Sequence, residues 1–570
     1  MEEVRLTRRE AIVSLAGAGA ATALAAALAA CGKTDSKALS FDGAILGPDA
    51  ALGHRLRTAD LLSRPAVRTE RVGTAILGGG VSGLSAAWTL ARNGDMDFRV
   101  YELEAEAGGT AVAGSNAVSR YPWAAHYLPV PVYPNRAVEA LLEEIGAIAG
   151  RDGDGDPVFA EEMLCREPEE RVFHGGQWHG GLYPRDGASP ADLEQLLRFE
   201  EEVRALAARR DAKGRRAFAV PTRRSSDDAD LLALDRIPME TWLAERGFTS
   251  KRLRWLVEYG CRDDFGGSLS ETSAWAGLHY HSARLTGEDP EEEAAEFLTW
   301  PEGNGRIVDH LAASAKGRLV PSALVFDVAP RKAAGGPVVV KYLDAAKDEV
   351  VAVEARDAVC ALPKFALARV LAPWRVAPPP FLRDLHYAPW LVANVTLSAR
   401  PRERGFPMAW DNVIYDSPSL GYVVATHQTG PRSGRDTGPT VLTWYHAYAG
   451  ETPMAAREKL YGATWEELAS AVLADLCRAH PDLPPLVRRI DVMRWGHAML
   501  RPVPGFLSVC RARLTIGSRT SGGSAADLPG PLGLPSPTVH VSLAHRRPRP
   551  VRLLSFGPSP RCVRGYFGLG

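Results

Sequence analysis

Three glycines and one glutamate have the spacing of a dinucleotide-binding site. Gly78, Gly80 and Gly83 fit the pattern G-x-G-x-x-G, and Glu102 follows the last glycine by 102 − 83 = 19 residues. The first glycine permits a tight turn, the second lets a pyrophosphate approach the backbone, and the third lets a helix pack closely on a strand. A carboxylate about 20 residues further on accepts hydrogen bonds from ribose hydroxyls and disfavours a 2′-phosphate. The spacing therefore predicts a dinucleotide site that does not take NADP.

The surrounding residues predict the strand, turn, helix and strand that such a site requires. Apolar residues 75–77 precede the turn, residues 84–91 have a helical pattern, and residues 98–101 form a second apolar run that ends at Glu102. Val81 and Ser82 fall at the helix N-terminus, where unpaired N–H groups and the helix dipole favour a phosphate. This context favours a nucleotide site over a glycine-rich loop that matches the pattern by chance.

The residues after Glu102 resemble those of the flavin amine oxidase and protoporphyrinogen oxidase superfamily, whose members have Glu-x5-Gly-Gly-Arg at this place. Here Gly108 and Gly109 follow the glutamate at the same spacing, and Thr110 stands where many members have arginine. The resemblance implies FAD as the cofactor, with the glycine pair beside the diphosphate. The threonine at 110 implies contacts from the backbone rather than from an arginine.

Weaker resemblance to the superfamily extends over residues 71–516. Residues 300–305 (Trp-Pro-Glu-Gly-Asn-Gly) resemble the entrance to the second half of the FAD domain, and residues 357–363 resemble the strand that closes it. Residues 322–328 resemble the strand whose backbone contacts the adenine, at the position of Val325. The resemblance implies an α/β fold: a Rossmann-like FAD-binding domain (GR2-type) with a second α+β substrate domain.

Four segments resemble a bacterial subgroup of secreted FAD oxidoreductases for which the resemblance implies no substrate. They are residues 121–129, 261–266, 410–415 and 495–499.

Residues that could act on a substrate are few in this sequence. His126 and Tyr127 follow the glycine pair at about the distance where the family chain passes the flavin, and a packed aromatic loop is the alternative. His497 could approach the flavin from the last strand, or could be a core histidine. Many amine oxidases have a lysine bridged by water to flavin N5, but neither Lys341 nor Lys364 has a matching context, which argues against simple amine oxidase chemistry.

The composition describes a globular protein with balanced charge. The 570 residues include 67 basic and 68 acidic side chains, and 46% are apolar. A chain of this length should form two or three domains. The charge balance gives no reason to expect a nucleic acid partner.

The N-terminal residues resemble an export signal. Arg8 and Arg9 precede an alanine-rich run over residues 11–30, which is typical of twin-arginine signals. The run ends at Cys31 in a sequence that resembles a lipoprotein processing box, which implies lipidation of Cys31, membrane attachment and a periplasmic or external location. A transmembrane anchor is the alternative, with the same orientation.

The remaining cysteines show neither C-x-x-C nor metal-ligand spacing, so we expect isolated buried thiols and no metal site. They are Cys165, Cys261, Cys360, Cys477, Cys510 and Cys562.

These patterns divide the chain into eight parts. We expect a signal (1–30), a polar tether (31–70), the first part of the FAD-binding domain (71–125), a helical cap or substrate domain (126–296), the second part of the FAD-binding domain (297–375), the substrate-domain sheet (376–500), a return to the FAD domain (501–545) and an aberrant tail (546–570). Within the cap, helical patterns cover residues 190–209 and 239–259.

The tail departs from the family pattern. No acidic residue follows Asp527, six arginines do, and prolines interrupt both helix and strand. Our hypothesis is a frameshifted ending, which resequencing of the gene would test.

The sequence therefore predicts an FAD-dependent oxidoreductase, similar to amine oxidases, that oxidises or desaturates a small amine-bearing or apolar substrate. Oxygen or a quinone would accept the electrons. One alternative is an isoprenoid- or carotenoid-type desaturase or isomerase. The other is a catalytically idle, lipid-anchored binding protein with a flavoprotein fold.

Overall fold

The computed structural model describes residues 39–131, 135–285, 296–332, 336–429 and 438–507, together with the backbone of residues 539–540. The predicted signal, Cys31 and the aberrant tail lie outside these residues. Within them, no helix is both long and apolar enough to cross a membrane. The four cysteines of the described part, Cys165, Cys261, Cys360 and Cys477, are free thiols.

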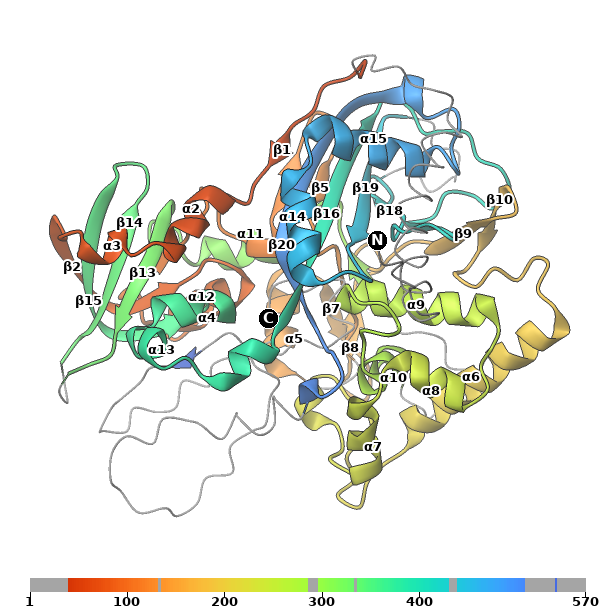
Figure 1. Ribbon diagram of the computed structural model, residues 1–570, viewed down its shortest axis with the longest axis horizontal. Coiled ribbons are helices and arrows are strands. Elements are labelled where there is room, and N and C mark those ends of the chain that lie inside the picture. Colours follow the sequence, from red (N-terminus) through yellow and green to blue (C-terminus); the bar gives the residue numbers. More distant parts are fainter. Residues whose placement is uncertain are drawn as a thin grey trace, which may run out of the picture.

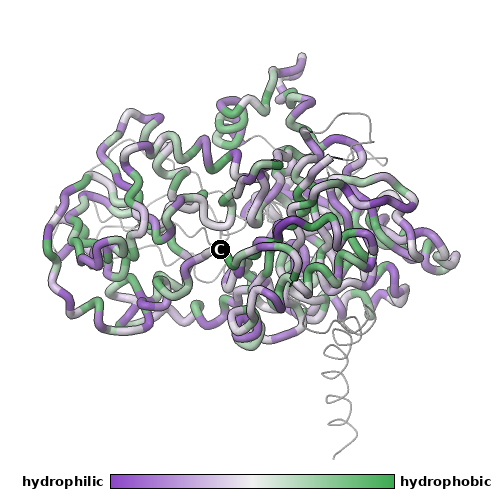
Figure 2. Tube along the Cα trace, turned by 90° about the horizontal axis from the view of Figure 1, so that it is seen from above, coloured by the Kyte–Doolittle hydropathy of each residue, from purple (hydrophilic) through white to green (hydrophobic). Residues whose placement is uncertain are grey.

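The described residues form two lobes, each built on its own large sheet (Figure 1). Hydrophobic residues gather inside both lobes, and hydrophilic residues lie mainly on the outside (Figure 2). One lobe contains the glycine motif, and the second contains the segment predicted as the substrate-domain sheet.

The first lobe has a sheet with the strand order β12-β3-β2-β15-β14-β13, and β21 also pairs with β15. Its strands are β2 (Arg68–Leu77), β3 (Phe98–Tyr101), β12 (Leu319–Val320), β13 (Ala323–Ala329), β14 (Val338–Asp344), β15 (Glu349–Cys360) and β21 (Val539–His540). The pairs β12–β3, β3–β2 and β2–β15 are parallel, and β13, β14 and β15 form an antiparallel meander. Residues 75–77 are fully buried, as expected for a central parallel strand covered on both faces.

Helices cover this Rossmann-like sheet. They are α4 (Val81–Arg92), α11 (Gly305–Ala313), α12 (Lys364–Val370) and α13 (Ala372–Val376). The predicted strand–helix–strand unit around the glycines is confirmed as β2, α4 and β3. The pairing of β21 with β15 brings residues 539–540, within the predicted return segment, back to this lobe.

The second lobe has a mainly antiparallel sheet with the order β1-β20-β16-β19-β18-β17-β9-β10. Its strands are β1 (Ile45–Leu46), β9 (Glu170–His174), β10 (Gln177–Gly180), β16 (His386–Leu397), β17 (Asp411–Ile414), β18 (Tyr422–Val424), β19 (Thr440–Ala447) and β20 (Val487–Arg501). Helices α14 (Pro453–Gly462) and α15 (Trp465–Leu476) pack against it through a shared apolar core.

The region 126–296 holds the expected helices but also strands, because β9 and β10 extend the second sheet through the parallel pair of β17 and β9. Its larger helices are α5 (Arg136–Glu144), α6 (Pro190–Ala208), α8 (Met239–Glu245), α9 (Lys251–Phe265) and α10 (Ala274–Ser282). The helix expected over 239–259 is two helices, separated by a turn in which Gly247 has φ +70°.

The expected tether is wrong for residues 39–70. β1 pairs with β20, and the Ala44 N–H donates to Asp491 Oδ1 at 3.1 Å. Leu61, in α3 (Asp60–Ser63), is buried against β13. These residues are polar in composition, but their few apolar side chains and their backbone contacts join them to both lobes.

A single hydrophobic core connects the two lobes. It runs from β2 and α4 through the aromatic segment 121–128 to Trp390, Tyr445 and Trp495 in the second sheet. The segment that follows the glycine motif is therefore packed between the two sheets, where it can join a cofactor site to a substrate site.

Candidate active site

The glycine turn has the geometry that its sequence predicts. Gly78 has φ +100°, which favours glycine, and a side chain on Gly83 would place its Cβ 1.8 Å from the Gly78 carbonyl oxygen. Gly83 is thus required for α4 to approach the turn. Gly80 caps the N-terminus of α4 without a side-chain hydrogen bond, so the first turn of the helix keeps backbone donors for a ligand.

Two glycine segments face each other in front of this helix. Gly80 forms a parallel bridge with Gly108, whose N–H donates to the Gly79 carbonyl at 2.9 Å. A Cβ added at Gly80 would have only the Gly109 Cα within 4 Å, at 3.9 Å. Since neither segment carries side chains here, they form a cradle that leaves backbone N–H groups open to a phosphate.

Glu102 ends β3 and lies against the glycine turn. Its Oε2 accepts from the Gly79 N–H at 2.6 Å, and its Oε1 accepts from the Glu104 N–H at 2.9 Å. Burial raises the pKa of the Glu102 carboxyl, and the backbone hydrogen bonds from Glu104 and Gly79 act against this shift. The carboxylate therefore holds the turn in shape as well as lying where a ribose is expected.

The other predicted cofactor residues surround the same cradle. Val81 and Ser82 form the first turn of α4, and Thr110 lies in a short 3₁₀ helix directly after the glycine pair. Val325 lies in β13, which begins beside Glu102 because the Ala323 N–H donates to the Glu102 carbonyl at 2.7 Å. The fold thus brings together predicted cofactor residues that are far apart in the sequence, from Gly78 to Val325.

A short path of backbone contacts leads from the cradle to His126 and Tyr127. The Ala125 N–H donates to the Thr110 carbonyl at 3.2 Å, and the Asn304 N–H donates to the Ala125 carbonyl at 3.0 Å. Segment 300–305, expected at the entrance to the second FAD half, therefore contacts the aromatic segment directly.

His126 and Tyr127 have different positions within this segment. The His126 ring stacks on Tyr445 at 4.7 Å between ring centroids, and its Nδ1 is 2.8 Å from the Ala124 carbonyl, so this buried histidine is part of the aromatic core. Tyr127 lies on the wall of a cavity of about 460 Å³ in the second lobe. The structure brings both next to the cradle, but only Tyr127 faces the cavity.

The cavity has an aromatic and charged lining. Acidic side chains include Glu169, Glu170 and Asp411, and the aromatic walls include Tyr127, Phe297 and Trp410. Arg185, Arg284 and His281 provide positive or titratable groups, and the remaining wall is formed largely by the segment 180–183. None of the described lining residues is a lysine.

Buried acids interact with the cavity residues Asp411 and Arg284. Burial, and then the neighbouring carboxyl groups of Asp264 and Asp411, raise the pKa of Asp263 well above its usual value. Burial, and then Glu170, raise the pKa of Asp411 in the same direction. Residues 261–264 lie at the end of α9. Their two carboxyl groups, on Asp263 and Asp264, are buried close to Asp411.

Arg284 is a cavity residue that the sequence did not indicate. Its Nη2 donates to the Tyr127 phenol oxygen at 2.8 Å. Burial lowers the pKa of the guanidinium, but its interactions with Tyr127 and Asp264 outweigh this effect and leave the pKa raised. A positive charge is thus fixed beside Tyr127.

His497 lies apart from this cavity, against the first lobe. Its ring stacks on Phe365 of α12 at 4.1 Å between centroids and contacts Tyr387 edge-on at 6.1 Å. Burial, and then the charges of Arg457 and Arg57, lower the pKa of His497 to about 3. His497 is half-buried and does not line the cavity that contains Tyr127.

Comparison with known proteins agrees with this architecture. Residues 76–145 match the model of an NAD(P)-binding Rossmann-like domain. No curated protein matches the chain.

Solved structures with a similar fold include enzymes of different chemistry. Cyclohexylamine oxidase from Brevibacterium oxydans IH-35A is 16% identical with a TM-score of 0.53, covering 79% of this chain and 90% of that one. Putrescine oxidase bound to putrescine is 15% identical with a TM-score of 0.50, covering 72% and 82%. A fatty acid isomerase from P. acnes is 17% identical with a TM-score of 0.50, covering 75% and 86%. The chain thus has the two-domain fold of these enzymes, a Rossmann-like dinucleotide-binding domain joined to a second α+β domain.

Proposed function

We propose that this protein is an FAD-dependent oxidoreductase that oxidises a small, positively charged amine. The observation that carries the proposal is the position of Tyr127, which lies 18 residues after Gly109, is connected to the cradle through Ala125 and Thr110, and faces a cavity with acidic and aromatic walls.

The residues of the cradle fit FAD. Gly80 and Gly109 leave room for a diphosphate, the α4 N-terminus supplies donors, and Glu102 supplies a carboxylate at the end of β3. Val325 offers backbone groups for an adenine. Bound FAD would supply the redox chemistry, and the protein would position the substrate and control its electrostatic surroundings.

The cavity has the size and chemistry for a small cation. Its volume of about 460 Å³ falls in the range of small-molecule sites. Glu169, Glu170 and Asp411 can attract a positive charge, and the face of Trp410 can bind one through a cation–π contact. A substrate cation would stabilise the ionised form of Asp411, whose pKa is raised in its absence.

Tyr127 and Arg284 would orient the substrate rather than remove its proton. The Arg284 donor at 2.8 Å engages the phenol oxygen, and the fixed guanidinium repels a cation, which directs an ammonium group towards the carboxylates. Since no described lining residue is a lysine, the familiar lysine–water arrangement beside the flavin is not part of this proposal.

The charged lining favours an amine over an isoprenoid substrate. A long apolar molecule would displace water from these acidic and basic side chains and offer them no hydrogen bonds in exchange, at a cost of several kcal/mol. An idle binding protein would have the same cavity but would not transfer electrons.

The direct test is anaerobic mixing of the FAD-loaded protein with small primary and secondary amines, followed through the flavin absorbance. Bleaching by amines, with no bleaching by neutral isosteres, porphyrinogens or polyenes, is the expected result. Bleaching by a polyene alone would contradict amine oxidation, and a bound flavin that no substrate class reduces would favour the idle protein. Subsequent mixing with oxygen or a quinone identifies the acceptor.

The sequence also supports a location outside the cytoplasm. Arg8, Arg9 and Cys31 form the basis of the proposed twin-arginine export and lipid anchor. Replacing Cys31 with serine should abolish labelling by a radioactive fatty acid and release the protein from membranes. Persistent membrane attachment of that variant would favour the transmembrane alternative.

A further inference from the structure

Two histidines lie on one face of the β9–β10 hairpin. Gly175 and Gly176 form its two-residue turn, with φ +61° and +85°, the backbone that a tight hairpin requires. His179 pairs with Val172, two residues before His174. Because side chains alternate along strands, His174 and His179 are diagonal neighbours on the same face.

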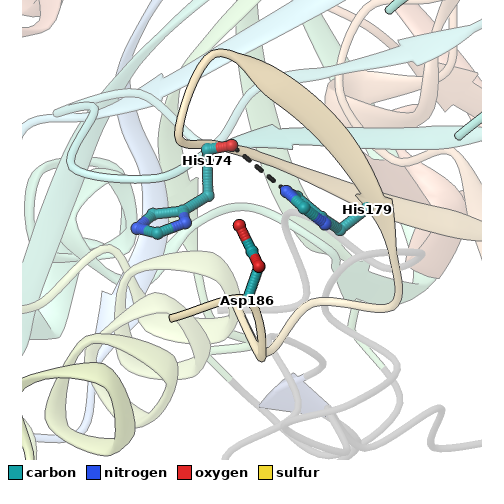
Figure 3. A group of neighbouring side chains, drawn as sticks. All are labelled: His174, His179 and Asp186. Carbon is teal, nitrogen blue, oxygen red and sulfur yellow. Dashed lines mark hydrogen bonds between the residues drawn. The ribbon is translucent and has the colours of Figure 1, made fainter. Parts of the chain in front are cut away.

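Asp186 reaches the same place from the chain that follows the hairpin. One ligand atom from each of His174, His179 and Asp186 lies within 4.8 Å of the others. Figure 3 shows the Asp186 carboxylate between the two imidazole rings. Zinc bonds of about 2.0–2.1 Å place tetrahedral ligand atoms about 3.3 Å apart, so the half-exposed histidines and exposed Asp186 need only a small side-chain movement to bind one ion.

The electrostatics suit a metal that prefers neutral imidazole. Burial, and then the charges of Arg252 and His179, lower the pKa of His174, and Asp186 and Asp416 act in the opposite direction. Among the described residues, the buried Nδ1 of His174 has no hydrogen-bond partner. Nε2 of His179 is 3.2 Å from the His174 carbonyl, a contact that orients its ring.

We propose that His174, His179 and Asp186 bind a divalent transition metal, with Zn²⁺ as the best match, and that water completes its coordination. Two imidazoles and one carboxylate are ordinary zinc ligands, whereas Mg²⁺ and Ca²⁺ prefer oxygen ligands alone. From the sequence we expected no metal site, because these three residues follow no metal motif.

The position of this site gives the metal a structural role at the cavity. His179 directly precedes Gly180, Asp186 directly follows Arg185, and residues 180–183 and 185 line the cavity. A metal bound to His179 and Asp186 would hold both ends of the wall segment 180–185 in place. The metal therefore fixes the shape of the cavity wall, and this inference does not depend on the proposed reaction.

Calorimetric titration of the chelator-treated full chain with ZnCl₂ tests the site. Wild type should bind Zn²⁺ more than about tenfold more tightly than a H174A/H179A double variant, and D186N should weaken binding in the same direction. H386A, which removes an exposed histidine of β16, is the matched control and should leave the affinity unchanged. Thermal unfolding without metal should be the same for all four proteins, which checks their folding.

The outcomes separate the site from its role. Equal zinc affinity of wild type and the double variant overturns the site, since any binding then comes from other groups. Hydrogen exchange of the amides of residues 180–186 should slow on addition of ZnCl₂ in wild type and not in the double variant. Histidine-dependent binding without this protection overturns the role in the cavity wall.

Discussion

Arg284 donates a hydrogen bond from Nη2 to the phenol oxygen of Tyr127 over 2.8 Å, and both side chains line the same cavity. Tyr127 belongs to the segment that follows the glycine cradle, whereas Arg284 follows α10 in the helical layer. The bond therefore joins the segment that follows the glycine cradle to the helical layer at the cavity wall.

Replacing Tyr127 with phenylalanine should weaken the binding of an amine by about tenfold, or about 1.4 kcal/mol, without loss of FAD. The variant removes the acceptor of a charged donor and leaves the Arg284 charge less compensated at the cavity wall. Anaerobic titration of the flavin spectrum with the amine measures the effect. Y342F, which alters a tyrosine of β14 outside the cavity, serves as control. Unchanged amine affinity in Y127F would exclude a role for this bond in recognition.

Alanine at Gly80 and at Gly83 should have different effects. At Gly80 the added Cβ makes only an ordinary 3.9 Å contact with Gly109, so G80A should fold normally but bind FAD about tenfold more weakly, because the methyl group enters the cradle. At Gly83 the Cβ would lie 1.8 Å from the Gly78 carbonyl, so G83A should lower the free energy of unfolding. Denaturant unfolding and FAD titration measure both. A G80A protein with wild-type FAD affinity would place the diphosphate elsewhere.

Binding of a cationic ligand should strengthen as the pH rises. Burial and Glu170 raise the pKa of Asp411, so this carboxyl is protonated below its raised pKa and cannot attract a cation; above it, the carboxylate can. A quaternary ammonium ligand keeps its charge at every pH, so its dissociation constant measured between pH 5 and 9 reports on the protein. D411N should flatten the profile. Affinity that falls with rising pH would contradict the assignment.

His497 should affect stability at low pH rather than turnover. Its folded-state pKa of about 3 lies below the ordinary value of 6.5, so unfolding takes up a proton below pH 6.5. The stabilising contribution is complete above pH 6.5 and is lost as the pH falls towards 3. In H497Q the free energy of unfolding should depend less steeply on pH in this window, by at most about 1.4 kcal/mol per pH unit.

H386Q, at an exposed position of β16, should keep the wild-type slope and provides the comparison. If H497Q lost amine oxidation while its free energy of unfolding kept the wild-type dependence on pH, His497 would instead have a role in the reaction.

Local sequence pattern predicted the nucleotide lobe well, for physical reasons. The turn at Gly78, the packing at Gly83 and the carboxylate at Glu102 all depend on residues within one strand–helix–strand unit. The spacing of these residues in the sequence is therefore enough to predict their arrangement. Tyr127 was indicated only by its distance from the glycine pair, and its place on the cavity wall is a result of the structure.

The cavity was less predictable because distant pairings create it. The parallel pairing of β9 with β17 brings Glu170 opposite Asp411 across 241 positions of sequence (411 − 170), and no local pattern encodes this contact. The predicted tether was wrong for a similar reason, since β1 joins the sheet by pairing with β20, which lies far away in the sequence. The β9–β10 hairpin was a missed local signal, because Gly175–Gly176 between alternating residues is typical of a tight turn.

The most direct test of the central claim is the visible absorption spectrum of the purified protein, with chromatographic identification of any nucleotide released on denaturation. The cradle predicts a flavin absorption band and the release of FAD rather than FMN or NAD. In G80A the same band should be weaker, because less FAD is bound. A folded wild-type protein that is colourless and stays colourless after incubation with excess FAD would contradict the assignment of this site and the proposed oxidoreductase function.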